Sequence, residues 1–262
     1  MFVLIVALQF AFNNELTLRQ YELQTNKVEA SFRVALITDL HCSEYGEGQK
    51  ELLDALSSAA PDIVLFGGDI ADDDLPLDHM IELVAAVAKK YDCYYVFGNH
   101  ENRRGDKQVI KQILASYGIT LLEGQSVPLR VNGQKINLCG VDDFDIGKKD
   151  FKKQLENTFS ESTTGNYTIL LVHRPEKIDY YLKYDFDLVL SGHTHGGQWR
   201  IPLILNGLLA PDQGLFPKYG GGKYQLGATT LIVSRGLARD YTHIPRIFNP
   251  PELVVVDVVP VN

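Results

Sequence analysis

The sequence predicts an α/β fold built on a parallel sheet that is covered by helices. The first observation is that, from Ser31 onward, short apolar runs alternate with polar or amphipathic segments of helix length. The second is that two strand–helix–strand units follow one another, and the crossover helix of such a unit makes its two strands parallel. The expected elements are, in order, strand 32–38, helix 49–60, strand 63–66, helix 77–91, strand 93–97 and helix 107–117.

The second half of the chain changes character. The runs 126–132 and 135–141 flank Asn132-Gly133, a dipeptide typical of tight hairpin turns, so they are expected to form a hairpin. The remaining expected elements are a helix at 148–159 and strands at 167–172, 188–190, 229–234 and 253–259.

A stretch rich in glycine and proline, 196–227, is expected to form a long loop, and a loop of this length in a compact domain is usually functional. Its apolar side chains have two interpretations: they form a surface that faces lipid or acyl chains, or they pack over the sheet. These side chains are Trp199, Leu203, Ile204, Leu205, Leu208 and Leu209.

The composition is that of an ordinary globular protein, since 45% of the 262 residues are hydrophobic and 22% are charged. The formal net charge of −8 argues against general nucleic-acid binding, which needs a basic surface to displace counterions from phosphates. Phosphate chemistry stays open, because bound metal ions supply positive charge locally. The cysteines Cys42, Cys93 and Cys139 form neither a disulfide framework nor a CxxC zinc site.

Residues 1–30 are predicted to be an apolar segment followed by an edge strand, and residues 31–262 one domain. The segment Met1–Phe12 is apolar except for Gln9, too short to span a membrane alone, and lacks the basic start and cleavage site of a signal peptide. Two interpretations remain open: the trailing half of a membrane anchor, or a buried N-terminal strand or helix. The near-alternating apolar residues in 15–25 favour the edge strand.

Five short polar clusters follow predicted strands. Because ligands of open α/β sheets bind outside the carboxyl ends of the strands, we expect the clusters to converge on one rim. They hold five of the seven histidines of the chain. The clusters are Asp-Leu-His at 39–41, Gly-Gly-Asp at 67–69, Gly-Asn-His-Glu at 98–101, His-Arg-Pro at 173–175 and Ser-Gly-His-Thr-His-Gly-Gly-Gln at 191–198.

The side chains of these clusters suit divalent metal ions, since they offer carboxylate and amide oxygens and imidazole nitrogens without requiring thiolates. Seven ligands are too many for one tetrahedral zinc and suit two ions that share a bridging carboxylate. Two such ions can activate a bridging water and clamp the oxygens of a phosphoryl group. The candidate ligands are Asp39, His41, Asp69, Asn99, His173, His193 and His195.

The order of these motifs resembles the calcineurin-like metallophosphoesterase superfamily, from about residue 32 to the end of the chain. The resemblance implies a four-layer α/β/β/α sandwich and a dinuclear, metal-dependent phosphohydrolase. It also implies that His100 is catalytic, protonating the leaving oxygen or stabilising the transition state. By the same resemblance, one ion would bind Asp39, His41, Asp69 and His195, and the other Asp69, Asn99, His173 and His193, with Asp69 bridging.

The segments 192–198, 216–220, 234–236 and 245–252 are similar to a bacterial branch of membrane-associated or exported phosphodiesterases. Some members of that branch act on lipid-linked pyrophosphates such as UDP-diacylglucosamine. The resemblance therefore implies a phosphodiester or pyrophosphate substrate, lipid-linked or nucleotide. It also implies a membrane-associated or extracytoplasmic location with membrane contact through the N-terminus, while a cytoplasmic location stays open.

Several alternatives stay open. The residue types do not select among Mn, Fe, Zn, Ni and Co, since all of these accept nitrogen and oxygen ligands. Arg103 and Arg235 are candidate contacts to the substrate phosphate, and Asp72 and Arg174 are candidates to support the ligands from outside. The alternative functions are a phosphomonoesterase such as a protein phosphatase, and a non-catalytic scaffold on the same fold.

Overall fold

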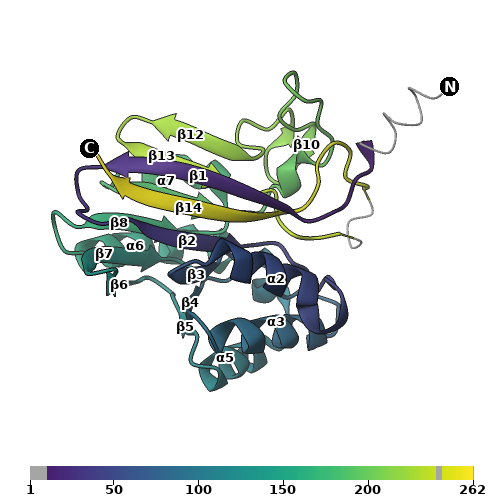
Figure 1. The fold of residues 1–262 in the computed structure, drawn as a ribbon, viewed down its shortest axis with the longest axis horizontal. Coiled ribbons are helices and arrows are strands. Elements are labelled where there is room, and N and C mark those ends of the chain that lie inside the picture. Colours follow the sequence, from purple (N-terminus) through teal and green to yellow (C-terminus); the bar gives the residue numbers. More distant parts are fainter. Residues whose placement is uncertain (1–10, 240–243, 262) are drawn as a thin grey trace.

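The computed structural model describes residues 11–239 and 244–261, and in them two six-stranded sheets pack face to face (Figure 1). The first sheet has the order β1-β14-β2-β3-β4-β5 and the second the order β12-β13-β9-β8-β7-β6. Helices α2, α3 and α5 pack on the outer face of the first sheet, and α6 and α7 on that of the second. The predicted four-layer α/β/β/α sandwich is confirmed.

The first sheet combines parallel and antiparallel pairs. Strands β2 to β5 are mutually parallel, β14 is antiparallel to β2, and β1 runs parallel to β14 at the edge of the sheet. The predicted edge strand is therefore confirmed. The bounds are β1 Thr17–Thr25, β2 Phe32–Ile37, β3 Ile63–Phe66, β4 Asp92–Tyr95, β5 Thr120–Leu121 and β14 Glu252–Pro260.

The second sheet is parallel from β7 to β13, with the antiparallel strands β6 and β12 at its edges. The predicted hairpin is confirmed: β6 and β7 pair across Asn132-Gly133, both with positive φ. The bounds are β6 Gln125–Val131, β7 Gln134–Gly140, β8 Tyr167–Leu171, β9 Leu188–Ser191, β12 Gly222–Leu226 and β13 Thr229–Val233.

The predicted helices are confirmed to within a few residues at each end. A short helix that the sequence analysis missed, α4, carries the Asn99-His100 pair. The helices of the described residues are α2 Lys50–Ala59, α3 Asp78–Ala88, α4 Asn99–Arg103, α5 Lys107–Ser116, α6 Lys148–Ser160 and α7 Ile178–Tyr181.

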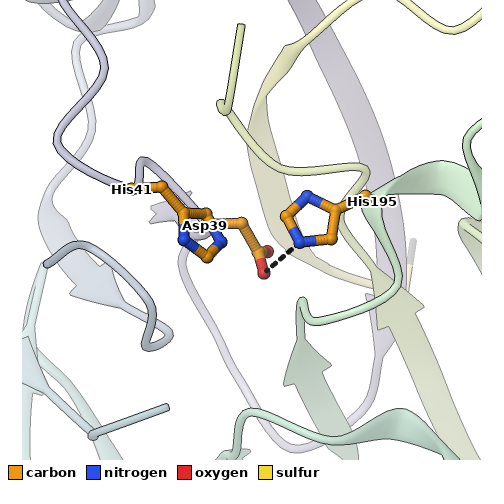
Figure 2. Close-up of side chains that lie close together, drawn as sticks. All are labelled: Asp39, His41 and His195. Atoms are coloured by element: carbon orange, nitrogen blue, oxygen red, sulfur yellow. Dashed lines mark ion pairs between the residues drawn. The ribbon is translucent and has the colours of Figure 1, made fainter. Parts of the chain in front are cut away.

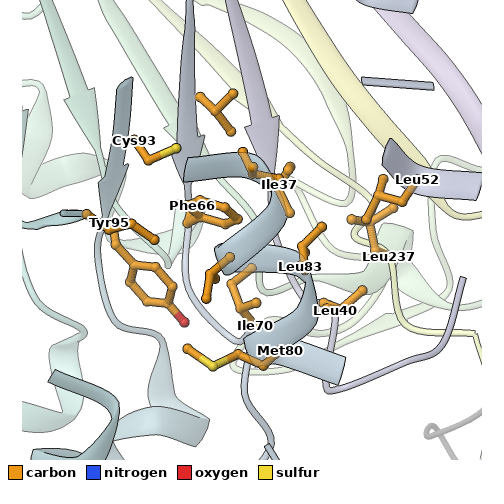
Figure 3. Packing of buried hydrophobic residues seen from close by; sticks show 14 of the residues in the cluster. Ile37, Leu40, Leu52, Phe66, Ile70, Met80, Leu83, Cys93, Tyr95 and Leu237 are labelled. Atoms are coloured by element: carbon orange, nitrogen blue, oxygen red, sulfur yellow. The ribbon is translucent and has the colours of Figure 1, made fainter. Parts of the chain in front are cut away.

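Apolar residues fill all three interfaces of the sandwich. Along β2, Val34 and Leu36 face the other sheet while Ala35 and Ile37 face the helices, so all four are buried. Figure 3 shows the helix-facing core, in which Phe66 packs beside Ile37 under α3. Burial on both faces explains why these strands are continuous apolar runs in the sequence. The packed layers hold the strand ends, and hence the polar clusters, in fixed positions.

The stretch 196–227 is not a loop throughout, contrary to the sequence-based expectation. It contains the small ladder of β10 (Leu209–Ala210) and β11 (Gly214–Leu215) and then the edge strand β12. Leu203 and Ile204 are exposed, so packing over the sheet is wrong for these two side chains. The strands β10 and β11 have two residues each, too few for an alternating pattern, and β12 alternates only over Lys223–Leu226.

No helix among the described residues is long and apolar enough to cross a membrane. The apolar segment Met1–Phe12 lies outside the described residues except for Ala11 and Phe12. Its two interpretations, and the division of the chain at residue 31, stay predictions.

Candidate active site

The five polar clusters meet at one rim, where β2, β3, β4, β8 and β9 end. Figure 2 shows Asp39 and His41, from the turn after β2, facing His195 from the turn after β9. The His195 Nε2 atom lies 3.9 Å from the Asp39 carboxylate, and the His41 and His195 rings are 5.1 Å apart between centroids. All three side chains are buried. They form a first group of ligand-type atoms.

The second group consists of Asp69, His173 and His193. We refer to the two groups together as the strand-end cluster. The His173 Nε2 atom lies 3.0 Å from Asp69 Oδ2 and 3.1 Å from His193 Nδ1. Asp69 Oδ2 also lies 3.8 Å from His41 Nε2 of the first group. The Asp69 carboxylate therefore stands between the two groups.

Two of these histidines have one ring nitrogen held by a partner outside the cluster. His173 Nδ1 lies 2.9 Å from the Gly67 carbonyl oxygen, which can only accept, so Nδ1 carries the hydrogen. His41 Nδ1 lies 3.1 Å from the Asp72 carboxylate in the same manner. In both rings Nε2 is left pointing at Asp69, which is the arrangement typical of metal-ligating histidines.

Asp212 is the partner that holds one ring nitrogen of His193, and it was not predicted from the sequence. Its Oδ2 atom lies 2.8 Å from His193 Nε2, which leaves Nδ1 facing His173. Buried Arg174 donates to Asp212 and, through two nitrogens, to Asp143. Asp212 sits in the stretch expected to be a loop, 19 residues from His193, and no local motif marks it.

Glu101, the last residue of the third cluster, supports the turn that carries Asp69. Its two carboxylate oxygens accept hydrogen bonds from the backbone N–H groups of Asp69, Ile70, Ala71 and Gly98. Burial and the charge of Asp69 raise the pKa of Glu101. This role was not predicted, although a Glu at the third helical position is the capping-box signal.

The backbone around the cluster is strained. Asp39, His41, Asp69, His193 and His195 all have φ between 47° and 70°, a region that residues other than glycine seldom adopt. Such strain persists only where the surrounding structure enforces it, and it concentrates at functional sites.

Two glycines allow close approach at the cluster. A Cβ atom at Gly192 would lie 2.2 Å from Asp39 Oδ2, and one at Gly98 would lie 2.1 Å from Asp69 Oδ1. No other residue fits at either position.

The cluster fits divalent cations. The Asn99 side-chain oxygen is buried and, among the described residues, has no hydrogen-bond partner. Burial, together with the positive charge of His41 and Arg246, holds the pKa of His195 well below its ordinary value, so its imidazole is neutral and can donate a lone pair. Despite complete burial, the neighbouring histidines hold the pKa of Asp69 well below its ordinary value. A buried carboxylate, a neutral imidazole and an unpaired amide oxygen are the donors such ions need.

His100 lies beside the cluster, with its ring centroid 4.5 Å from that of His41. Its Nδ1 atom is 3.0 Å from Asp73 Oδ1 and 3.3 Å from Asp72 Oδ2. Burial lowers the pKa of His100, but the hydrogen bond to Asp72 and the charges of Asp69 and Asp73 outweigh it and raise the pKa to about 9.

The predicted arginine contacts lie apart from one another. Arg103 is half exposed and pairs with Asp145 at 3.2 Å. Arg235 is buried and pairs with Glu252 at 2.5 Å, at the start of β14. Their assignment to substrate binding stays a prediction.

Fold and site together define the class of protein to which the chain belongs. The chain belongs to the calcineurin-like phosphoesterase family, whose sequence model matches residues 32–197. It is therefore a phosphoesterase, a hydrolase of a family that uses divalent metal ions. This confirms the family resemblance that the motifs indicate.

Individual relatives agree with this class. The chain is 31% identical over 231 residues to the uncharacterised metallophosphoesterase YkuE of Bacillus subtilis, covering 86% of this chain and 78% of the relative. It is 27% identical over 237 residues to the phosphodiesterase YaeI of Escherichia coli, covering 88% and 83%. The chain spans 62% to 64% of the length of metallophosphoesterases from Campylobacter jejuni and Helicobacter pylori.

Among solved structures, the NAD nucleotidase of Haemophilus influenzae superposes with a TM-score of 0.51 at 17% identity. The match covers 79% of this chain and 45% of that protein. At this identity the likeness is one of fold alone.

Proposed function

We propose that the protein hydrolyses a phosphodiester or pyrophosphate bond with two divalent ions held at the strand-end cluster. The observation that carries the proposal is the position of Asp69, whose Oδ2 atom faces His173 at 3.0 Å and His41 at 3.8 Å. One carboxylate between two histidine groups suits a pair of ions that share it. When bound, such ions supply positive charge for the phosphoryl oxygens and a water activated for attack.

The chain's own residues divide between the two ions as the family resemblance implies. One ion would be held by Asp39, His41, Asp69 and His195, of which Asp39, His41 and His195 form the first group of ligand atoms. The other would be held by the second group, Asp69, His173 and His193, together with the buried side-chain oxygen of Asn99. Hydrogen bonds to Gly67, Asp72 and Asp212 orient three of the imidazoles, so these rings are preorganised for metal binding.

His100 is the proton donor of this proposal. Its Nδ1 atom is engaged by the carboxylates of Asp72 and Asp73, so Nε2–H is the donor left for the leaving-group oxygen. The same carboxylates favour the protonated ring. A positioned acid of this kind contributes roughly 10² to 10⁴ in rate.

The diester preference rests on similarity to a relative named as a phosphodiesterase. A lipid-linked pyrophosphate belongs to the same reaction class, since hydrolysis breaks one P–O bond of a doubly substituted phosphate. Phosphomonoesters are the competing class, and the same ligand set would serve them.

The test measures hydrolysis of bis-p-nitrophenyl phosphate by protein stripped of metal and then supplied with Mn²⁺, Zn²⁺, Fe²⁺, Ni²⁺ or Co²⁺. We expect activity that requires metal and disappears in Asp69→Asn, while Asp185→Asn, on an exposed segment, keeps it. Binding of two ions per chain is expected by mass spectrometry under native conditions. Binding of one ion, or hydrolysis of p-nitrophenyl phosphate in strong preference to the diester, would contradict the proposal.

A further inference from the structure

A second pocket of about 540 Å³ opens beside the candidate active site, at the start of β1. Three arginines line it: Arg19 from β1, Arg200 from the turn after His195, and Arg235 from the end of β13. We refer to it as the arginine pocket. None of the seven candidate metal ligands lines it.

The arginine pocket carries excess positive charge. Glu252 Oε2 lies 2.5 Å from Arg235 and 3.8 Å from Arg19, so one carboxylate serves two guanidinium groups. The Arg200 side chain donates its hydrogen bonds to neutral oxygens, the backbone carbonyls of Gly196 and Asn206 and the side-chain amide of Asn206. Burial and the neighbouring charge of Arg235 lower the pKa of Arg200. Three cations and one anion leave an unbalanced charge that an anionic ligand would neutralise.

The outer wall of the pocket is an apolar hairpin, residues 201–205, closed by hydrogen bonds between Ile201 and Leu205. Its tip is Pro202-Leu203-Ile204, where Leu203 is fully exposed and Ile204 has 82% of its surface exposed. A soluble surface seldom presents two adjacent aliphatic side chains at a loop tip without a partner.

More apolar surface lies on the same segment. Seven of the fourteen exposed large apolar side chains of the described residues fall within 199–216, including Leu215 and Phe216. The chain also enters the fold here, because Phe248, which lines the pocket, donates its backbone N–H to the Ala11 carbonyl at 2.7 Å. In the sequence, the ten residues before Ala11 are apolar except for Gln9.

We propose that this face docks on a membrane, with the arginine pocket holding the phosphate headgroup of an anionic phospholipid and the apolar hairpin inserted among its acyl chains. Basic and apolar groups side by side are what interfacial membrane binding requires, because anionic headgroups and hydrocarbon lie at adjacent depths. A soluble anion would use the arginines and leave the hairpin tip in water. The bilayer surface is therefore the occupant that satisfies both features.

Docking in this way would bring the candidate active site to the bilayer surface. Arg200 donates to the Gly196 carbonyl at 3.2 Å, directly after His195 in the chain. The wall of the pocket and the rim of the site are thus formed by one continuous segment of the chain.

The experiment is flotation of the purified full chain with vesicles of phosphatidylcholine, alone or mixed with phosphatidylglycerol, without substrate. We expect binding only to the mixed vesicles. The double variant Leu203→Asp/Ile204→Asp should weaken it about tenfold or more, the contribution of one buried leucine-sized side chain. Arg19→Gln and Arg200→Gln should each weaken it about fivefold.

Val109→Asp is the matched control, since Val109 is an exposed apolar residue on α5, among the helices that cover the first sheet (Figure 1). It should bind as the unaltered chain does. Both Asp variants should hydrolyse soluble bis-p-nitrophenyl phosphate normally, which separates this proposal from the proposed reaction. Equal binding to both kinds of vesicle, or full binding by the Leu203→Asp/Ile204→Asp variant, would overturn the proposal.

Discussion

The strand-end cluster and the arginine pocket lie next to each other and differ in charge and in burial. In the cluster, buried carboxylates and imidazoles converge, and partners such as Gly67, Asp72 and Asp212 hold the rings in place. In the arginine pocket, cations outnumber carboxylates and the outer wall is exposed and apolar. The first arrangement suits small cations, and the second suits an anion at an apolar boundary. A single rim can thus present two sites, because a few charges decide which ligand each attracts.

The largest expected effect breaks the cluster. Asp69→Asn should lower hydrolysis of bis-p-nitrophenyl phosphate roughly 10³-fold or more, because the amide removes the shared negative charge. Chelation of the metals should have the same effect and should be reversed by adding Mn²⁺. Steady-state kinetics and metal analysis measure both. An Asp69→Asn variant that keeps two ions and full activity would refute the central role of this carboxylate.

His100→Ala should separate chemistry from metal binding. We expect turnover of diesters with poor leaving groups to fall about 10² to 10⁴-fold, because these need a proton donor. Turnover of p-nitrophenyl esters should fall much less, and the metal content should stay normal. His79→Ala is the matched control, since His79 pairs with Glu82 on α3 and belongs to no group of ligand atoms in the described residues. Loss of metal in His100→Ala would contradict its role as the acid.

Asp212→Asn should show how much the outer partners of the histidines contribute. We expect metal affinity, measured by calorimetry, to fall about 10 to 100-fold, because His193 Nε2 loses its carboxylate partner. Asn also tolerates the φ of 56° at this position. Asp145→Asn is the control, since Asp145 contacts Arg174 and not the histidine. Equal effects of the two variants would mean that Asp212 acts only through general loop stability.

The smallest expected effect is that of a substitution in the apolar hairpin, and it is best measured beside one in the core. Leu36→Ala, between the sheets, should lower the free energy of unfolding by about 2 to 5 kcal/mol, measured in urea. Leu203→Asp should change it by less than about 0.5 kcal/mol, because Leu203 is fully exposed. A large destabilisation by Leu203→Asp would show that the hairpin tip packs on the protein in solution.

Much of the fold could be predicted because its signals are local. The run 32–38 reads as a strand because both of its faces are buried, and Asn132-Gly133 marks a hairpin because both residues adopt positive φ. The strand β12 and the β10–β11 ladder escaped prediction because they are short and lie in a stretch rich in glycine and proline. Two residues, as in β10 and β11, cannot show a period, and the alternation of β12 covers only four residues.

The candidate ligands were also predictable, because each follows a buried strand and parallel strands end at a common rim. Their outer partners were not. Asp212 reaches His193 from a distant stretch, and Glu101 acts through hydrogen bonds to a turn more than 30 residues earlier. Arg235 shows the same limit, since only the fold directs it to Glu252 and the second pocket.

By itself the sequence determined the α/β class, the order of the main strands and helices, and the residue types that collect at the rim. These follow from local periodicity and from the rule that the ends of parallel strands meet. Tertiary structure alone decided which carboxylate stands between the two histidine groups, which partners orient each ring, and that Leu203 and Ile204 face solvent above three arginines. Each of these depends on distances between segments far apart in the chain, and side-chain pattern along one segment carries no information about them.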